Sequence, residues 1–482
     1  MAARYAQWLA GANARLNAFT SVTPPSAWSG RGAGGHGATA SGATGAGAGV
    51  RISIKDNICT VEEDGPSTAA SLLLDDYVSP FEAKAVAALK AALPDAVMVG
   101  KTNLDEFGMG AHSQNSAAGP VVSPWHPARS PGGSSGGAGV SVAINAAHIA
   151  LGSDTGGSVR LPAAYNGIIG IKPTYGLVSR RGLISYASSM DTIGVLAAEL
   201  GMAATGLDAI AGFDADDATS CQAPDAITAL GSYADAVEAA PELAGKRIGL
   251  PRSALIAELA PEVKQLWREA ARSLEAGGAS VEWIELPSLP VALAAYYVIA
   301  AAEAASNLSR YDGLRYGNGA AGRDTVGYDA VVRKRILLGT HVLSAAAYAE
   351  YYVAAGRVRA DLAAELAAAF GHVDALLLPT APTPPPRIDG TVADDAPLDH
   401  ELAAYANDVF TVPANLAGLP AFSLPLGTAS TADGILPLGM QLIGPAFSEH
   451  TLFGLSAHLL DAFAHAAPLS HTAAWHQQPY DG

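Results

Sequence analysis

Two serines set among glycines are the most constraining feature of this chain of 482 residues. Ser134 lies in GGSSGG, Ser158 lies in DTGGS, and the apolar stretch between them can pack in a protein core. Glycines let the backbone approach a reacting atom closely, because they lack a Cβ and adopt backbone angles closed to other residues. The run Thr155, Gly156, Gly157 and Ser158 can aim several amide groups at one point, as an oxyanion hole requires.

A single upstream lysine separates this pattern from a flexible loop or a phosphate cradle, which are also Gly/Ser-rich. Lys55 follows the apolar run VRISI, and no acidic residue precedes it in the chain. A serine needs a base to become a nucleophile, and with no histidine near either motif, Lys55 is the candidate. The pKa of its amine must then fall well below ~10.4, which burial provides. Asp56 faces the other side of the strand, where we expect it to make a structural hydrogen bond.

The motifs IKDN, GGSSGG and DTGGSVR, in this order, resemble those of the amidase signature family. The separation of the two serines along the chain also matches that family. The resemblance implies that Ser158 is the nucleophile, that Lys55 is the base, and that Ser134 relays the proton between them. It further implies a cis peptide bond before Ser134.

Longer stretches are similar to one branch of this family, the A-type subunits of glutamyl-tRNA(Gln) amidotransferases. They are GKTNLDEFGMG (100–110), YYVIAAAEAASNLSRYDGLRYG (296–317), RKRILLGTHVLSA (333–345) and YANDVFTVPANLAGLPA (405–421). The local sequences AHSQNS (111–116) and RSPGGSS (129–135), with the acid-poor start of the chain, look like those of mitochondrial, fungal-type members. The similarity covers most of residues 50 to 460.

That branch holds its glutamine substrate with an aromatic residue, an arginine and an aspartate. By position in the matching motifs these are Tyr296, Arg335 and Asp408, with Tyr297 and Arg333 as neighbouring alternatives. An α-carboxylate suits a bidentate guanidinium, and an α-ammonium suits a carboxylate. A solvent-facing helix charge at Arg335 and a helix N-cap at Asp408 are the competing structural interpretations.

Composition favours an enzyme with a large buried core. Half of the residues are hydrophobic and 15% are charged. No apolar run approaches the ~18 residues that a membrane helix needs, and the longest one, ending at Glu303, is predicted to be a buried helix. The two cysteines indicate no disulfide framework. The twelve histidines show no metal-ligand spacing, so we expect no metal site.

Short apolar strands alternate with helical stretches after residue 50. The predicted strands include VRISI, AVMVG, HIALGS, GIIGIKP, KRIGLP, SVEWIEL, VDALLLP and LPLGMQLIG. The predicted helices include FEAKAVAALKAAL and residues 260–277, 345–370 and 448–463. This alternation predicts an α/β fold, in which a large mixed and mostly parallel β-sheet is covered by helices on both faces.

Four segments are expected along the chain. Residues 1–28 are predicted to form an N-terminal helix closed by a Pro stop, and their Arg-bearing, acid-free composition is typical of a transit peptide. Residues 29–49 are predicted to be a Gly/Ala/Ser-rich connector, 50–465 an amidase signature domain, and 466–482 a peripheral tail. We therefore expect a mitochondrial matrix location, with the cytoplasm as the alternative.

The net charge of −17 argues against this chain binding a nucleic acid unaided. The resemblance implies a glutaminase subunit that passes ammonia to a B-type partner subunit, alongside a small third subunit of the C or F type. It implies that tRNA is contacted only through the partner, that ATP and Mg are used there, and that this chain binds no cofactor. One alternative is a stand-alone amidase that acts on small or aryl amides. Another is an inactive scaffold, which the intact set of motifs makes less favoured.

Overall fold

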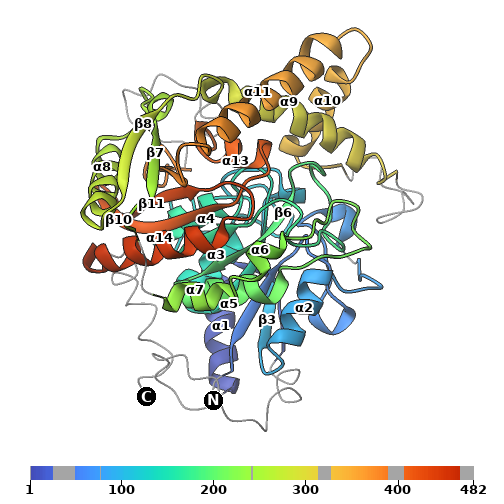
Figure 1. The fold of residues 1–482 in the computed structure, drawn as a ribbon. Coiled ribbons are helices and arrows are strands. Elements are labelled where there is room, and N and C mark those ends of the chain that lie inside the picture. Colours follow the sequence, from blue (N-terminus) through green and yellow to red (C-terminus); the bar gives the residue numbers. More distant parts are fainter. Residues whose placement is uncertain are drawn as a thin grey trace.

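The computed structural model describes residues 2–24, 49–75, 77–239, 243–312, 327–388 and 406–466. Residues 29–48 of the expected connector and 467–482 of the expected tail lie outside the described residues. Eleven strands form one sheet through the middle of the molecule, with helices on both of its faces (Figure 1). An α/β fold with one large mixed sheet is therefore confirmed.

The strands run in the order β1-β3-β2-β4-β6-β5-β10-β11-β9-β7-β8 across the sheet. Their bounds are Phe19–Val22 (β1), Arg51–Lys55 (β2), Val97–Thr102 (β3), Ile149–Asp154 (β4), Ile169–Lys172 (β5), Thr192–Ala197 (β6), Arg247–Pro251 (β7), Ser280–Ile284 (β8), Ala375–Pro379 (β9), Ala421–Thr431 (β10) and Gly434–Ile443 (β11). Central strands such as β4 are buried along their whole length, as expected where helices cover both faces.

The expectation of a mostly parallel sheet is wrong. Only β2 with β3, β2 with β4, β7 with β8 and β7 with β9 pair in parallel, and the other described pairs are antiparallel. Buried apolar strands suggested parallel pairing, but helices on both faces bury antiparallel strands equally well. β10 and β11 form a hairpin, and β6 runs antiparallel to both β4 and β5.

Strand β10 was not among the predicted strands, and its sequence explains why. Pro425 lies inside it, and proline in a strand interior removes a ladder hydrogen bond. The strand accommodates this residue with a shift in register between Pro425 and Gly427. β6 was also not predicted.

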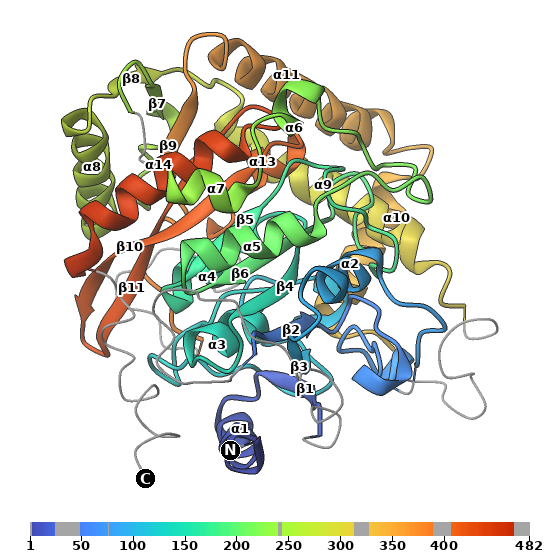
Figure 2. The same cartoon turned by 60° about the horizontal axis from the view of Figure 1, so that its bottom comes forward.

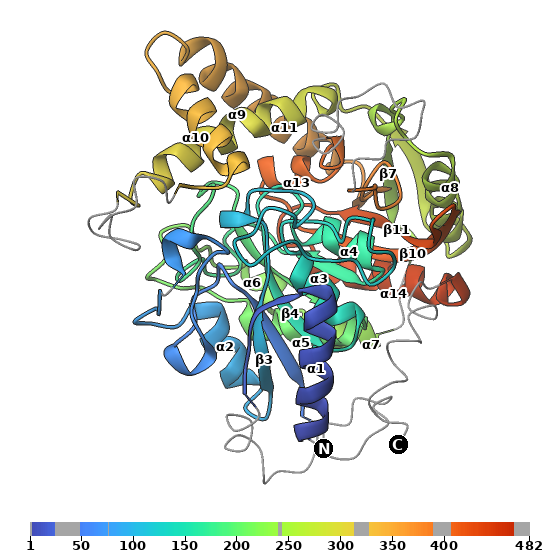
Figure 3. The same cartoon turned by 180° about the vertical axis from the view of Figure 1, so that it is seen from behind.

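The helices form two layers and an arm. Their bounds are Ala2–Leu16 (α1), Lys84–Ala92 (α2), Gly136–Ala143 (α3), Arg160–Asn166 (α4), Leu200–Ile210 (α5), Asp225–Thr228 (α6), Tyr233–Glu238 (α7), Pro261–Ala276 (α8), Leu289–Leu308 (α9), Ala330–Val342 (α10), Ala354–Ala369 (α11), Val412–Leu416 (α13) and Glu449–Ala462 (α14). Helices α2, α5, α7 and α14 neighbour one another on one face of the sheet (Figure 2). Helices α3 and α4 pack on the opposite face (Figure 3), and α9, α10 and α11 form an arm beyond one edge of that layer.

The N-terminal segment differs from the expected helix up to the prolines. α1 ends at Leu16, and β1 lies between it and Pro24, antiparallel to β3. The buried Leu9 and Leu16 of α1 belong to a small core cluster with Val140 and Ile144, which come from α3 and the residue after it. This segment therefore packs on the helix that follows the first glycine-flanked serine.

Helix α9 is the one helix among the described residues that is long and apolar enough to cross a membrane. Half of its most apolar stretch is buried in the protein, where it packs against α10, α11 and α13. Core helices of globular proteins meet the same criterion. Its Glu303 carboxylate accepts hydrogen bonds from the amide and hydroxyl of Ser189, so it also ties the arm to the sheet layer.

Candidate active site

Lys55 ends strand β2 in the interior of the protein, with no exposed surface. Its Nζ lies 2.7 Å from Ser134 Oγ, 2.7 Å from Ser135 Oγ and 2.9 Å from Ser153 Oγ. Ser153 is on the neighbouring strand β4, and the other two serines immediately precede helix α3. The amine is thus surrounded by hydroxyl groups, which can either accept a hydrogen bond or donate one.

The electrostatics of Lys55 agree with the need for a neutral amine. Burial lowers the pKa of Lys55 to about 7, although three carboxylates in its surroundings act in the opposite direction. Asp56 is not among those carboxylates; it accepts a hydrogen bond from Thr68 and lies 3.6 Å from Lys101 Nζ. The expected structural role of Asp56 matches this geometry.

Ser134 follows a cis peptide bond from Gly133, as the resemblance implied. A Cβ at position 133 would lie 2.3 Å from the Asp105 carboxylate, so only glycine fits there. Asp105 in turn accepts hydrogen bonds from the amides of Ser113 and Gln114, which hold the loop beside the serine.

Ser158 lies where β4 gives way to α4, and it is the more accessible of the two motif serines. It is 8% exposed, whereas Ser134 is 1% exposed. Its carbonyl accepts a hydrogen bond of 3.1 Å from the Ser135 amide, which fixes the two motifs side by side. The Ser158 hydroxyl has no hydrogen-bond partner among the described residues. The structure therefore contains the hydrogen bond between Ser134 and Lys55, but not one between Ser158 and Ser134.

The loop from Thr155 to Ser158 provides amide donors, but not all of those expected. The Gly157 amide donates to Asp154 Oδ1 at 2.9 Å, so it is not available for an oxyanion. The amides of Thr155, Gly156 and Ser158 have no protein acceptor in the described part of the chain. Burial by itself would raise the pKa of Asp154, but the contact with Arg160 holds that pKa at about 2, so the loop is anchored on a permanent anion.

Both glycines of this loop are required by close contacts. Gly157 has φ near 140°, and a Cβ there would lie 2.3 Å from Thr411 Oγ1. A Cβ on Gly156 would lie 2.5 Å from the Tyr296 ring. Thr411 donates to the Gly156 carbonyl at 2.6 Å and to the Asp408 carbonyl at 3.1 Å. The loop is therefore joined directly to the turn that carries Asp408.

The predicted substrate residues lie together against this loop. Tyr296 is buried beside Gly156, and its neighbour Tyr297 donates to Asp408 Oδ2 at 3.3 Å. The Arg335 guanidinium lies 5.3 Å from the centre of the Tyr297 ring. Burial raises the pKa of Asp408 to about 7, while Arg335 acts in the opposite direction. One cation and one carboxyl group thus flank an aromatic ring beside the loop that carries Ser158.

The positions of the side chains distinguish the alternative substrate residues that the sequence left open. Arg333 is exposed, whereas Arg335 on the same helix α10 is buried and faces the aromatic residues. Asp408 is not the N-cap of α13, since that helix begins after Thr411. Both Tyr296 and Tyr297 lie at the site, the first against the loop and the second between the two charged groups.

Two residues that the sequence analysis missed hold the site together. Asp191 Oδ1 accepts a hydrogen bond of 2.7 Å from Thr155 Oγ1, and its carboxylate also accepts from the Tyr186 amide. The Tyr186 hydroxyl accepts a hydrogen bond from Arg335. Asp191 and Tyr186 therefore connect the loop from Thr155 to Ser158 to the Arg335 guanidinium. Neither belongs to a motif with an obvious chemical signature, so no local pattern could have identified them.

No cluster of three or more histidine, cysteine or acidic side chains with metal-binding geometry occurs in the described ranges. The groups that meet at this site are serine hydroxyls, a buried amine and backbone amides. A buried amine that can act as a base, a hydroxyl that can relay a proton, an accessible serine and a loop of amide donors together fit the chemistry of a serine-type amide hydrolase.

Comparison with known proteins agrees with this chemistry. The sequence profile of the amidase family, described as Amidase, matches residues 2–453. The chain therefore belongs to the amidase family.

Individual relatives point to one branch of the family. The glutamyl-tRNA(Gln) amidotransferase A subunit of Thermosynechococcus vestitus is 44% identical over 440 residues, which are 89% of this chain and 85% of that protein. The corresponding A subunit of Natronomonas pharaonis is 45% identical over 416 residues, 84% of this chain and 93% of that protein. The crystal structure of the A subunit from Thermotoga maritima matches with a TM-score of 0.73 at 36% identity, covering 92% of this chain and 87% of that one.

Proposed function

We propose that this protein is the glutamine-hydrolysing A-type subunit of a glutamyl-tRNA(Gln) amidotransferase. The observation that carries this proposal is the pairing of Arg335 and Asp408 across Tyr297, next to the Ser158 loop. A free amino acid amide has one carboxylate and one ammonium near the bond to be cleaved, and this pair matches both. Similarity to proteins named as the A subunits of such enzymes supports the same assignment.

In the proposed reaction, Ser158 attacks the side-chain amide carbon of glutamine. Its hydroxyl proton passes to Ser134, whose own proton moves to the neutral amine of Lys55, 2.7 Å away. The carbonyl oxygen becomes an oxyanion that accepts from the amides of Thr155, Gly156 and Ser158. The proton then returns to the amide nitrogen, the C–N bond breaks and ammonia leaves. Water hydrolyses the acyl-enzyme to glutamate and restores the Ser158 hydroxyl.

The proposed relay needs a rotation of the Ser158 hydroxyl toward Ser134. Hydrogen bonds among catalytic groups are often loose without substrate and tighten when it binds. The restraints on the loop, from Asp154, Asp191 and Thr411, leave this side chain as the part that moves.

For the assembled enzyme we propose the division of labour that this assignment entails. Ammonia passes to a B-type subunit that uses ATP and Mg to activate Glu-tRNA(Gln), and a small third subunit of the C or F type completes the complex. The tRNA is contacted through the partner, and a mitochondrial matrix location is proposed from the composition of the N-terminal segment. Expression of the tagged full-length chain in its native cell tests both points, by the proteins that co-purify and by the compartment that contains it.

The decisive experiment compares two amides on the chain purified with its partner subunits. We expect efficient release of ammonia from glutamine and slow hydrolysis of propionamide, which has neither charged group. A wild-type preference for uncharged amides, with no B-type subunit in the purified complex, would replace this proposal with a stand-alone amidase.

A further inference from the structure

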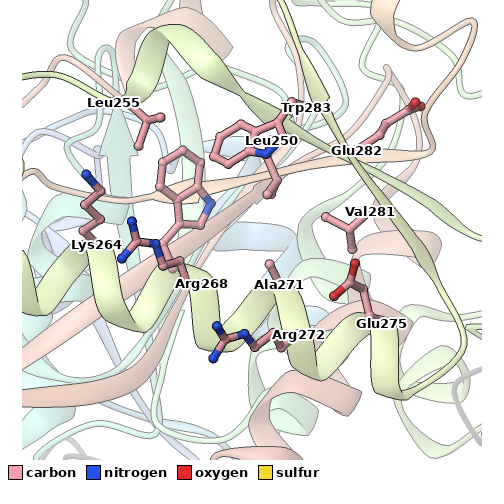
Figure 4. A pocket seen from close by; sticks show the side chains of 11 residues that line it. Leu250, Leu255, Lys264, Arg268, Ala271, Arg272, Glu275, Val281, Glu282 and Trp283 are labelled. Atoms are coloured by element: carbon pink, nitrogen blue, oxygen red, sulfur yellow. The ribbon is translucent and has the colours of Figure 1, made fainter.

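A cavity at the far edge of the sheet takes no part in the chemistry described above. It lies between α8 and the strands β7 and β8, with a volume of about 390 Å³ (Figure 4). Apolar side chains line it, among them Leu250, Leu255, Val281 and the two tryptophans Trp267 and Trp283. The volume and the apolar part of the lining suit a compact apolar group.

Trp283 is held in place although it is 45% exposed. Its ring packs edge-on against the buried Trp267, with 5.8 Å between ring centroids, and the Arg252 guanidinium lies 5.4 Å from its centre. A tryptophan that is rigid before binding loses little conformational entropy when a partner covers it. Such exposed aromatic anchors dominate the energetics of protein interfaces.

Three cations follow the cavity along one flank of α8. Lys264, Arg268 and Arg272 are spaced by four residues, so they lie ~6 Å apart along the helix axis. Figure 4 shows their side chains beside the cavity, with Glu275 and Glu282 toward its other end. None of the three cations forms an ion pair within the described residues. In a chain with a net charge of −17, a row of three cations without ion pairs in the described ranges indicates an acidic ligand.

Strand β8 supplies the third element, a sheet edge. Among the described strands it pairs only with β7, with Leu250 opposite Trp283. An edge strand offers a row of backbone amides and carbonyls to another extended chain. A strand added to β8 would place alternate side chains on the face of the sheet that carries the cavity, toward the cations of α8.

We propose that this edge binds an extended segment of another protein, in which apolar and acidic side chains are arranged to fit the cavity and the three cations. Main-chain hydrogen bonds to β8 position the segment, an apolar side chain enters the cavity against Trp283, and acidic side chains pair with Lys264, Arg268 and Arg272. This site is separate from the proposed active site, because β8 lies seven strand positions from β4, a distance of ~34 Å across the sheet.

A second copy of this chain fits the edge poorly. Glu282 is the central residue of β8, so a symmetric antiparallel pair would place two glutamates directly opposite each other. A nucleic acid is also disfavoured, because its continuous phosphate backbone would pass Glu275 and Glu282 at the same cavity, whereas a peptide can place its acidic side chains at the cations alone. Both alternatives enter the test below.

The test is a selection of short random peptides displayed on phage against the full-length protein, followed by binding of the enriched peptides in solution. We expect the enriched sequences to combine acidic with apolar residues. Their association constant should fall roughly thirtyfold in Trp283→Ala. Arg268→Glu should weaken binding similarly. The matched control Arg357→Glu makes the same charge change on the exposed face of α11 and should bind normally. All three variants should hydrolyse the amide substrate at the wild-type rate.

Three results would overturn the proposal. One is enrichment of peptides that lack acidic residues, or of none at all. Another is equal affinity for a version of the peptide with N-methylated backbone amides, since such a peptide cannot pair with β8. The last is a tighter complex with single-stranded RNA, or a dimer of this chain in sedimentation that Trp283→Ala dissociates.

Discussion

Two lysines on adjacent strands, Lys55 on β2 and Lys101 on β3, are both fully buried, yet their surroundings differ in one decisive respect. Lys101 Nζ donates to the Ile58 carbonyl at 2.7 Å and to Ser67 Oγ at 2.8 Å, and the Asp56 carboxylate lies 3.6 Å away. Lys55 has no carboxylate within ion-pair distance among the described residues. Burial lowers the pKa of both amines; the nearby Asp56 carboxylate opposes that shift for Lys101, whereas only carboxylates beyond ion-pair distance oppose it for Lys55.

The comparison shows how a fold assigns two roles to one residue type. A carboxylate beside a buried lysine favours the charged form of the amine, because each charge stabilises the other, and such a pair joins parts of the structure. A buried lysine among hydroxyls can be neutral, because a hydroxyl can donate to the amine as well as accept from it.

A third buried lysine shows that a lowered pKa is not sufficient for catalysis. Burial lowers the pKa of Lys172 to about 7, as it does for Lys55. Lys172 Nζ, however, donates to the Pro173 carbonyl at 2.8 Å and forms no hydrogen bond with a serine hydroxyl in the described part of the chain. The chain of serines, and not the titration alone, therefore distinguishes the proposed base.

The largest expected effect tests the catalytic side of this comparison. Ser158→Ala should abolish amide hydrolysis, and Lys55→Ala should reduce kcat by about four powers of ten or more, because the three groups act as one unit. Adding Ser134→Ala to Lys55→Ala should cost little further activity. Steady-state kinetics on the complex, with circular dichroism to verify folding, give the answer. Near-normal turnover in folded Lys55→Ala would remove this lysine from the mechanism.

The next prediction tests the structural side. Lys101→Met should lower the free energy of unfolding by about 3–5 kcal/mol, because it leaves the Asp56 carboxyl buried without its counterion. Folded protein should keep a kcat close to wild type. Urea unfolding and kinetics on the same preparation separate the two quantities. The double variant Lys101→Met/Asp56→Asn should recover part of the lost stability; a fully additive loss would mean that the two residues do not interact.

A smaller effect concerns the charged groups that face the substrate. Arg335→Ala should raise the activation free energy for glutamine by about 2–4 kcal/mol, which lowers kcat/KM by about one to three powers of ten. For propionamide, kcat/KM should hardly change. Arg333→Ala, on the exposed side of the same helix, is the matched control and should behave as wild type. Equal losses for both amides would show that Arg335 supports the fold and does not select glutamine.

The smallest effect is in the pH dependence. Lys55 must lose its proton to act as a base, so kcat/KM should fall about tenfold per pH unit below its pKa of about 7. Asp408, whose pKa is raised to about 7, is protonated in the same range and then cannot pair with an ammonium. The glutamine profile should therefore be steeper than the propionamide profile.

Two variants assign these slopes. Asp408→Asn should make the glutamine profile as shallow as that of propionamide, although with lower activity throughout. Lys172→Met should leave the midpoint unchanged, because that lysine contacts none of the serines. A propionamide rate that stays flat from about pH 6 to about pH 9 would contradict a titrating base, provided that the chemical step limits the rate.

Much of the site could be predicted from the sequence because its central groups lie in short local motifs. A glycine-flanked serine and a lysine at the end of an apolar strand each have a local signature, as Ser158 and Lys55 show. The requirement for a depressed lysine pKa followed from chemistry alone. The alternation of strands and helices predicted a mixed sheet covered by helices. The direction of its strands could not be predicted, because antiparallel and parallel strands are equally apolar when both faces are covered.

The tertiary structure decided which groups meet. Ser135 and Ser153 surround Lys55 only because β2 and β4 are neighbours in the sheet, although 98 positions separate Lys55 from Ser153. Asp191 and Tyr186 come from another part of the chain and hydrogen-bond to Thr155 and Arg335, respectively. The Asp56 carboxylate lies near the amine of Lys101 and affects its pKa, although Asp56 follows Lys55 directly in the sequence. Electrostatic energies depend on distance in space and on burial. Sequence motifs therefore determined the candidate chemical groups, and only the packing of distant strands determined their partners and protonation.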